Sequence, residues 1–448
     1  MTLGLHLTGF APMVLYIAGI AVFLVSVFWR PEIGIYYIVP LLPLQTTRYK
    51  LHGFPLGAQW IDFILLGVLI GAWRKGYSVF TRNPLSRLLL ILSVLTYISL
   101  WRGALYLNRP MPIWFDDLRM SDWKNYMVIF LVFFLALASI RDSKQMRILL
   151  FLMCVSMLML NRTYINTATA RDFSAFSYEI RDEGPMGYAG ANGLAALEAQ
   201  FSAFLLGLYA LEGRALPKLG YIIVLGTCLV SLMYTLSRGG YVAVLLAALF
   251  VGIVKSRKLV IVVALFLFTW QMIVPNAVRE RVFMTEDSNG QLDHSAAVRL
   301  TLWDNALEIL RGDPVFGTGF DTYKFLHAVG PYEDTHNYYV KVALETGVLG
   351  FVIFLGLLTK MFLSGYRLFR ARAGDSFSQG LGLGLAGMIV ATAVANLFGD
   401  RWTYIEETGF MWVILAMVIR YQMTLDELPV GRPDNVEQPT CEETSEVL

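Results

Sequence analysis

Residues 272–337 read MIVPNAVRERVFMTEDSNGQLDHSAAVRLTLWDNALEILRGDPVFGTGFDTYKFLHAVGPYEDTHN. This stretch is mostly polar, and an apolar segment lies directly before it and directly after it. Most connections between helices are far shorter, so a polar connection of this size is expected to fold or to bind something. We therefore expect the working residues of the protein to lie in or beside this stretch.

The remainder of the chain is strongly apolar. Of its 448 residues, 56% are hydrophobic and 16% are charged, whereas soluble domains carry roughly 25% charged residues. Apolar runs long enough to cross a hydrocarbon core of about 30 Å recur along the chain. The sequence predicts an all-α polytopic membrane protein with about 12–13 transmembrane helices and a large, partly helical extracytoplasmic loop.

Thirteen segments have the composition of membrane spans. The second and third are short, and a re-entrant or tilted arrangement of these two would leave twelve or fourteen spans possible. The predicted spans are residues 10–29, 32–45, 58–73, 86–102, 124–140, 145–161, 190–211, 217–234, 239–255, 258–274, 336–363, 378–398 and 403–423.

The distribution of lysine and arginine predicts the orientation of these spans. Basic residues gather in short connections at every second position along the chain, and such connections lie on the cytoplasmic side. The longer, mixed connections then lie on the outer side, which is the periplasm if the cell is Gram-negative. The predicted division is 1–274 as N-terminal transmembrane helices, 275–335 as a large periplasmic loop, 336–423 as C-terminal transmembrane helices and 424–448 as a disordered cytoplasmic tail.

Arg238 is the first candidate for a binding residue. It opens a predicted span in the sequence Ser237-Arg238-Gly239-Gly240. An arginine at a membrane surface can simply extend to the lipid headgroups. Here, however, the two glycines permit close approach of a ligand, and a helix N-terminus offers free N–H groups. Arginine beside a helix N-terminus suits a phosphate group, so we favour binding.

Two further candidates lie within the polar stretch. Arg299 precedes apolar residues at helical spacing, which predicts an amphipathic helix, and by itself it is best interpreted as a solvated residue at the helix start. His336 opens the eleventh predicted span, and its imidazole can take a proton from a hydroxyl near neutral pH. An interfacial histidine without a role is an equal alternative.

Other polar features have structural interpretations. The Gly317-Thr318-Gly319 sequence favours a tight turn over a phosphate site. Lys341 and Glu345 are four residues apart on one helix and are expected to neutralise each other. The roles of three further charged residues inside spans stay open: Glu198, Glu406 and Glu407.

Several classes of chemistry are disfavoured. The three cysteines have no paired spacing, so neither a disulfide framework nor a metal site is indicated. The sequence contains no recognisable nucleophilic triad, Walker loop or dinucleotide-binding fingerprint. Energy-driven or nucleotide-sugar-dependent activity is therefore disfavoured, and no metal, cofactor or nucleic-acid partner is expected.

Five motifs follow one another in a recognisable order. Ser237-Arg238-Gly239 opens a span, Arg299 and Trp303 lie in the outer loop, Asp313-Pro314-Val315-Phe316-Gly317-Thr318-Gly319 follows, and His336-Asn337-Tyr338 precedes Glu345-Thr346-Gly347-Val348-Leu349-Gly350. The order and spacing resemble the O-antigen ligase and O-antigen polymerase family over roughly residues 184–365. The resemblance implies a polytopic membrane fold of the glycosyltransferase-C-like kind.

The resemblance also implies a reaction. In that family a glycan linked by pyrophosphate to a polyprenyl lipid, typically undecaprenyl, is moved whole to an acceptor hydroxyl, without a metal. Carried onto this chain, Arg238 and Arg299 would bind the pyrophosphate, and His336 would activate the acceptor hydroxyl. Arg279 and Arg281 would be secondary phosphate ligands.

The acceptor is left open by the sequence. A ligase transfers the glycan to a lipid A core, and a polymerase transfers it to a second lipid-linked repeat unit of O-antigen, capsule or exopolysaccharide. A flippase or transporter for lipid-linked sugars is a rival from another class, although its expected internal repeats are not visible. A scaffold in a glycan assembly complex is a third alternative.

Overall fold

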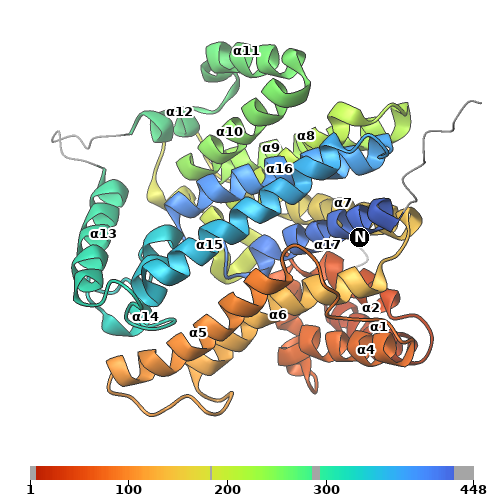
Figure 1. Ribbon diagram of the computed structural model, residues 1–448. Coiled ribbons are helices and arrows are strands. Elements are labelled where there is room, and N and C mark those ends of the chain that lie inside the picture. The colour runs from red at the N-terminus through yellow and green to blue at the C-terminus, as the bar shows by residue number, and fades with distance from the viewer. Residues whose placement is uncertain (1–6, 182–183, 285–292, 428–448) are drawn as a thin grey trace, which may run out of the picture.

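The structure is a computed structural model, and it describes residues 7–181, 184–284 and 293–427. Every regular element within these ranges is a helix, as Figure 1 shows. The predicted all-α class is therefore confirmed. The polar stretch also folds partly into helices, of which α13 is the longest.

The longer helices are α1 Leu7–Phe28, α4 Trp60–Arg74, α5 Ser86–Tyr106, α6 Leu118–Ser139, α7 Ser143–Ala168, α8 Gly190–Leu211, α9 Ala215–Tyr234, α10 Arg238–Lys255, α11 Arg257–Ile273, α13 His294–Gly312, α15 Tyr338–Arg370, α16 Ser376–Ala395 and α17 Ile405–Glu427. The short α-helices are α2 Glu32–Ile38, α3 Gln45–Tyr49, α12 Asn276–Phe283 and α14 Tyr323–Leu326. The 3-10 turns are η1 Val39–Leu41, η2 Lys50–Gly53, η3 Gly57–Gln59, η4 Tyr178–Ile180, η5 Gly184–Ala189 and η6 Asn396–Phe398.

Ten helices among the described residues are long and apolar enough to cross a membrane, or eleven if α11 and α12, which meet at a bend of 116°, form one span. The number is lower than thirteen because three predicted segments form shorter helices, namely the second, the third and the tenth, which becomes the 17-residue helix α11. The second becomes α2 and η1, where Pro40 and Pro43 prevent continuation. The third becomes α4, which has 15 residues and ends at Arg74, two residues before Gly76, whose φ is +70°.

The centre of the bundle is formed by α8, α16 and α17, which are the most buried of the spans. Glycines allow α8 and α16 to approach closely, because a Cβ on Gly207 would lie 2.3 Å from the backbone nitrogen of Gly384. Figure 1 shows α15 and α16 running together through the middle of the molecule. Close contact through small residues is the usual way in which helices associate within a membrane.

Helix α15 is interrupted at Gly347, whose φ is +69°. A Cβ here would lie 2.0 Å from the carbonyl oxygen of Val315. Residues 313–319 cross this interruption, and the Thr318 N–H donates to the carbonyl of Leu344 at 2.9 Å. The Gly317-Thr318-Gly319 sequence is thus a turn that fixes the polar stretch to α15, in agreement with its structural interpretation.

The predicted amphipathic helix is α13. Leu302 and Ala306 on its apolar face are fully buried, and they pack with Tyr323 of α14 and Leu344 of α15. Figure 1 shows α13 at the side of the bundle, next to α14 and the start of α15. Helix α17 continues to Glu427, and the remainder of the predicted tail, 428–448, lies outside the described residues.

Candidate functional site

Five arginines meet around one cavity of about 410 Å³, which we call the arginine cavity. They come from elements far apart in the sequence: the segment after η4, the start of α10, α12, α13 and the connection between η6 and α17. The arginines are Arg181, Arg238, Arg281, Arg299 and Arg401. The structure therefore brings together three of the four arginines predicted from the sequence and adds two that were not predicted.

Asp293 joins two of these arginines. Nη2 of Arg238 lies 2.6 Å from Oδ2 of Asp293, and Nη1 of Arg281 lies 3.5 Å from Oδ1. The Tyr178 hydroxyl donates to Oδ1 at 2.9 Å. Burial opposes ionisation of this carboxyl, but the Tyr178 hydroxyl and the arginines outweigh it and lower the pKa of Asp293. Asp293 is thus a fixed anion that holds two guanidinium groups in place.

Arg281 and Arg279 lie two residues apart on α12 and have different environments. Arg281 is buried and packs over the rings of Phe176 and Tyr178, at 4.9 and 5.5 Å from their centroids. Arg279 bonds to Asn276 on its own helix and does not line the arginine cavity. The structure therefore brings Arg281 into the site and leaves Arg279 outside it.

Arg299 has an unusual electrostatic environment. Its Nε has no hydrogen-bond partner within the part of the chain that the structure describes. Burial, together with the nearby charges of Arg238 and Arg281, lowers the pKa of Arg299 to about 10. A guanidinium whose charged form is disfavoured by its neighbours would be stabilised by an anion.

The charges around the arginine cavity do not balance. Arg401 forms an ion pair with Glu407 at 3.0 Å, and Asp293 serves Arg238 and Arg281. Two carboxylates thus face five arginines, which leaves three positive charges uncompensated among the described residues. Within the same ranges, no group of three or more His, Cys, Asp or Glu side chains is arranged to hold a metal ion.

Glycines expose the first turn of α10 to the arginine cavity. Gly239 and Gly240 both line it, and a Cβ on Gly239 would lie 2.8 Å from the ring of Phe398. The hydroxyl of Ser237, the N-cap residue, does not cap α10 but bonds to Asn192 at 2.9 Å. The N–H groups of this turn are therefore available to an anion, as the sequence predicts.

His336 lies beside the arginine cavity rather than in its wall. It has a left-handed backbone conformation, with a φ of +52°, directly before the N-cap residue of α15. Trp303, which does line the arginine cavity, donates from Nε1 to the carbonyl of Thr335 at 3.0 Å. This bond fixes the backbone next to His336 against the cavity wall.

Asp334 contacts His336 twice. Its Oδ2 accepts from the backbone N–H of His336 at 3.2 Å and lies 3.4 Å from Nδ1. Burial would raise the pKa of Asp334, but the contact with His336 and the charge of Lys341 reverse the effect and lower it. The backbone contact is an Asx-turn, in which an aspartate accepts from the N–H two residues on, and it lies at the left-handed residue His336.

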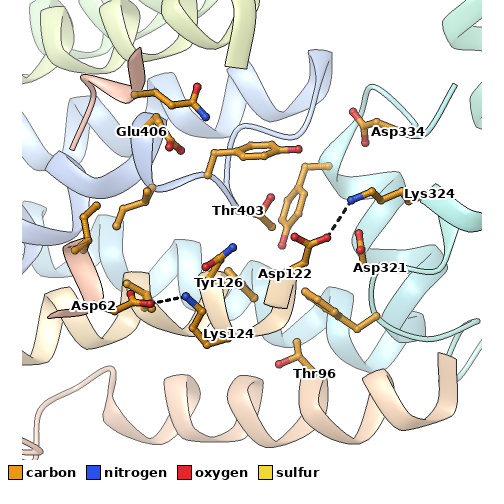
Figure 2. Close-up of a pocket in the computed structure, with 18 of the residues that line it drawn as sticks. Asp62, Thr96, Asp122, Lys124, Tyr126, Asp321, Lys324, Asp334, Thr403 and Glu406 are labelled. Carbon is orange, nitrogen blue, oxygen red and sulfur yellow. Dashed lines mark hydrogen bonds and ion pairs between the residues drawn. The ribbon is translucent and has the colours of Figure 1, made fainter. Parts of the chain in front are cut away.

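A second cavity of about 540 Å³ lies on the Asp334 side of His336, and we call it the carboxylate cavity (Figure 2). Two ion pairs cross it, Lys124 with Asp62 at 2.5 Å and Lys324 with Asp122 at 3.0 Å. Its acidic lining residues are Asp62, Asp122, Asp321, Glu333, Asp334, Glu345 and Glu406, and its lysines and arginine are Arg48, Lys124, Lys324 and Lys341.

The direct partners of Lys341 and Glu345 differ from those expected. Lys341 forms an ion pair with Asp400 at 3.1 Å. Glu345 accepts from the backbone N–H groups of Asp321 at 3.0 Å and Tyr323 at 3.4 Å. Lys341 and Glu345 therefore form no direct ion pair, because both side chains reach groups on other segments, although their opposite charges still attract each other.

The three remaining charged residues inside spans have distinct environments. Glu406 pairs with Arg48, and Glu407 pairs with Arg401. Glu198 is fully buried in α8 and lines neither cavity.

Sequence reasoning missed Arg181, Arg401 and Asp293. All three lie in polar connections that the sequence predicts to be on the same side as Arg238. Their position on one side of the membrane could have indicated a shared site. It does not show which of the many polar residues on that side meet at the arginine cavity.

Residues 223–355 of the chain match the family model Wzy_C, described as O-antigen ligase. The matched segment begins in α9 and ends in α15, and it contains Arg238, Arg281, Arg299 and His336. A comparison with curated proteins returned no match.

Proposed function

We propose that this multi-pass membrane protein, whose residues 223–355 match the Wzy_C O-antigen ligase model, transfers a glycan whole from a polyprenyl pyrophosphate donor to an acceptor hydroxyl. Undecaprenyl pyrophosphate is the lipid carrier we propose. We place the reaction at the periplasmic face of a bacterial inner membrane. The family match supports the broader assignment, a membrane glycosyltransferase of the O-antigen ligase or polymerase type.

The observation that carries the proposal is the convergence of five arginines on one cavity with a surplus of positive charge. A pyrophosphate diester carries two negative charges, and planar guanidinium groups bind phosphate oxygens in pairs. Arg238 and Arg299 are proposed to hold the pyrophosphate, with Arg281 beside them. Charge that develops on the leaving pyrophosphate would be stabilised by groups already fixed in position.

His336 is proposed to act as the general base. The acceptor oxygen attacks the anomeric carbon of the donor, and its proton passes to the imidazole. The bond between that carbon and the pyrophosphate oxygen breaks, and its electron pair leaves with the lipid pyrophosphate. Asp334, 3.4 Å from Nδ1 of His336, supports the proposal because it can orient the imidazole and stabilise the imidazolium.

Transfer to a lipid A core, as in a ligase, is the acceptor reaction we propose. Polymerisation of lipid-linked repeat units is the alternative, because both reactions use the same donor site. Reconstitution of the purified protein with a lipid-pyrophosphate oligosaccharide separates them. A product on added lipid A core indicates a ligase, whereas a ladder of lengthening lipid-linked glycan indicates a polymerase.

The same assay tests the proposed residues. His336→Ala and Arg238→Ala are expected to abolish product formation while the protein still folds and inserts. Arg279→Ala is the matched control, since Arg279 lies on α12 but outside the arginine cavity. Full transfer by both site variants would overturn the proposal. Transbilayer movement of the donor without any covalent product would favour a flippase.

A further inference from the structure

We propose that the carboxylate cavity binds the acceptor glycan, and that it selects a sugar that is uncharged or carries an amine over one that carries phosphate. The inference rests on the proposed transfer reaction and assigns a site to its second substrate. Its starting point is the position of His336 between two cavities of opposite charge.

His336 is connected to both cavities by short contacts. Asp334, whose Oδ2 lies 3.4 Å from Nδ1 of His336, lines the carboxylate cavity. Trp303, which donates to the carbonyl preceding His336, lines the arginine cavity. His336 itself lines neither cavity, and the proposal places its imidazole between a hydroxyl bound in one and the pyrophosphate bound in the other.

The carboxylate cavity has a surplus of negative charge. Three of its seven carboxylates pair with a lysine or arginine of the same cavity: Asp62 with Lys124, Asp122 with Lys324 and Glu406 with Arg48. The others form no ion pair with a lysine or arginine within the described ranges: Asp321, Glu333, Asp334 and Glu345. Asp334, whose pKa is lowered, keeps its negative charge, so an anionic sugar would be repelled here, whereas the arginine cavity would attract it.

Two carboxylate oxygens in this cavity lack a hydrogen-bond donor. Oδ2 of Asp321, a residue that is 8% exposed, and Oδ1 of Asp334 have no hydrogen-bond partner in the part of the chain that the structure describes. Buried acceptors without a donor are rare in folded proteins. Figure 2 shows both carboxylates on the same side of the cavity. Sugar hydroxyls and ammonium groups can donate to them, and a fully ionised phosphate cannot.

The remaining surface suits a sugar ring. Tyr126 and Phe320 line the cavity with rings 6.0 Å apart and almost parallel. Both rings are buried, so they form a rigid apolar part of the wall, and the carboxylates remain to bind the hydroxyls of a sugar. The volume of about 540 Å³ lies within the range typical of small-molecule sites. The end of an oligosaccharide therefore fits the cavity in size and chemistry.

Isothermal titration calorimetry on the full-length protein in nanodiscs tests this assignment. The probes are lipopolysaccharide core oligosaccharide with its phosphates retained, the same oligosaccharide after dephosphorylation, short uncharged glucose, galactose and N-acetylglucosamine oligosaccharides, and undecaprenyl pyrophosphate. The variants are Asp321→Asn, which suits the left-handed backbone of this residue (φ +56°), and Arg238→Ala.

We expect Asp321→Asn to bind the dephosphorylated or uncharged oligosaccharide roughly tenfold more weakly, and to bind undecaprenyl pyrophosphate like the wild type. Arg238→Ala should show the reverse pattern, which also shows that each variant is folded. Equal affinity for both core oligosaccharides, an unchanged affinity in Asp321→Asn, or no binding of any oligosaccharide would overturn the assignment. If the protein binds oligosaccharides selectively by charge but gives no product in the transfer assay, the proposed function is overturned, whereas the assignment of a glycan site to this cavity is retained.

Discussion

The guanidinium of Arg238, the first residue of α10, lies 2.6 Å from the carboxylate of Asp293, the N-cap residue of α13. The two residues are 55 positions apart, and the contact joins a membrane span to the polar stretch. The side chain of Asp293 is fully buried, whereas that of Arg238 is one quarter exposed. Arg238 is therefore held by one anion and still open to another on the cavity side.

Asp293→Ala should destabilise the protein. It leaves Arg281, which is 3% exposed, without its carboxylate partner, and removing one partner of a buried ion pair costs roughly 3 kcal/mol. We expect a lower midpoint of thermal unfolding and a higher KM for the lipid donor, because Arg238 loses its orientation. Asp293→Asn keeps the shape of the side chain, so its thermal midpoint and its KM should lie between those of the wild type and those of Asp293→Ala. A thermal midpoint in Asp293→Ala equal to that of the wild type would contradict this role.

Arg299→Ala should lower kcat/KM for the donor by on the order of 100-fold, the usual effect of removing one preorganised donor to a developing anion. Arg299→Lys should restore only part of this loss, since an ammonium cannot contact two phosphate oxygens in the same plane. Arg279→Ala, at an arginine outside the arginine cavity, is expected to stay within about twofold of the wild type. Initial rates at varied donor concentration provide the measurement, and equal losses at Arg279 and Arg299 would argue against the site.

Gly347→Ala should destabilise the fold severely. Gly347 has a φ of +69°, and a Cβ would lie 2.0 Å from the carbonyl oxygen of Val315. The segment that carries Val315 and Gly317 would therefore have to move away from α15 at Gly347. Gly226→Ala in α9 is the matched control, because a Cβ there meets nothing within 4 Å and alanine favours a helix by up to about 1 kcal/mol. Thermal unfolding in detergent compares the two, and similar midpoints would show that the interruption is not a packing requirement.

Asp321 should make stability depend on pH. Burial, opposed in part by Lys341, raises the pKa of Asp321 from 3.8 to about 7. Because the folded state holds this proton more tightly than the unfolded state, the contribution of Asp321 to stability falls as pH rises from about 4 to about 7. The difference in thermal midpoint between Asp321→Asn and the wild type should therefore shift in favour of the variant as pH rises from about 5 to about 8, which covers the upper part of that interval. A difference that is constant with pH would contradict the assignment.

The sequence by itself determined the features that depend on neighbouring residues. Hydropathy located each helix among the described residues that is long enough to cross a membrane, because crossing requires a continuous apolar run, but it also predicted three spans that form shorter helices. Helical periodicity located α13, and its predicted apolar face, including Leu302 and Ala306, is the face that packs on the bundle. Arg238 at the start of α10 followed from the Ser-Arg-Gly-Gly sequence and the chemistry of a helix N-terminus.

Only the tertiary structure decided which side chains meet. Arg279 and Arg281 are equivalent in sequence, but α12 turns Arg281 toward Asp293 and leaves Arg279 outside the site. Lys341 reaches Asp400 rather than Glu345, since a partner 59 residues away is closer in space than one turn along the helix. Such contacts depend on how separate helices pack, and no local pattern of residues carries that information.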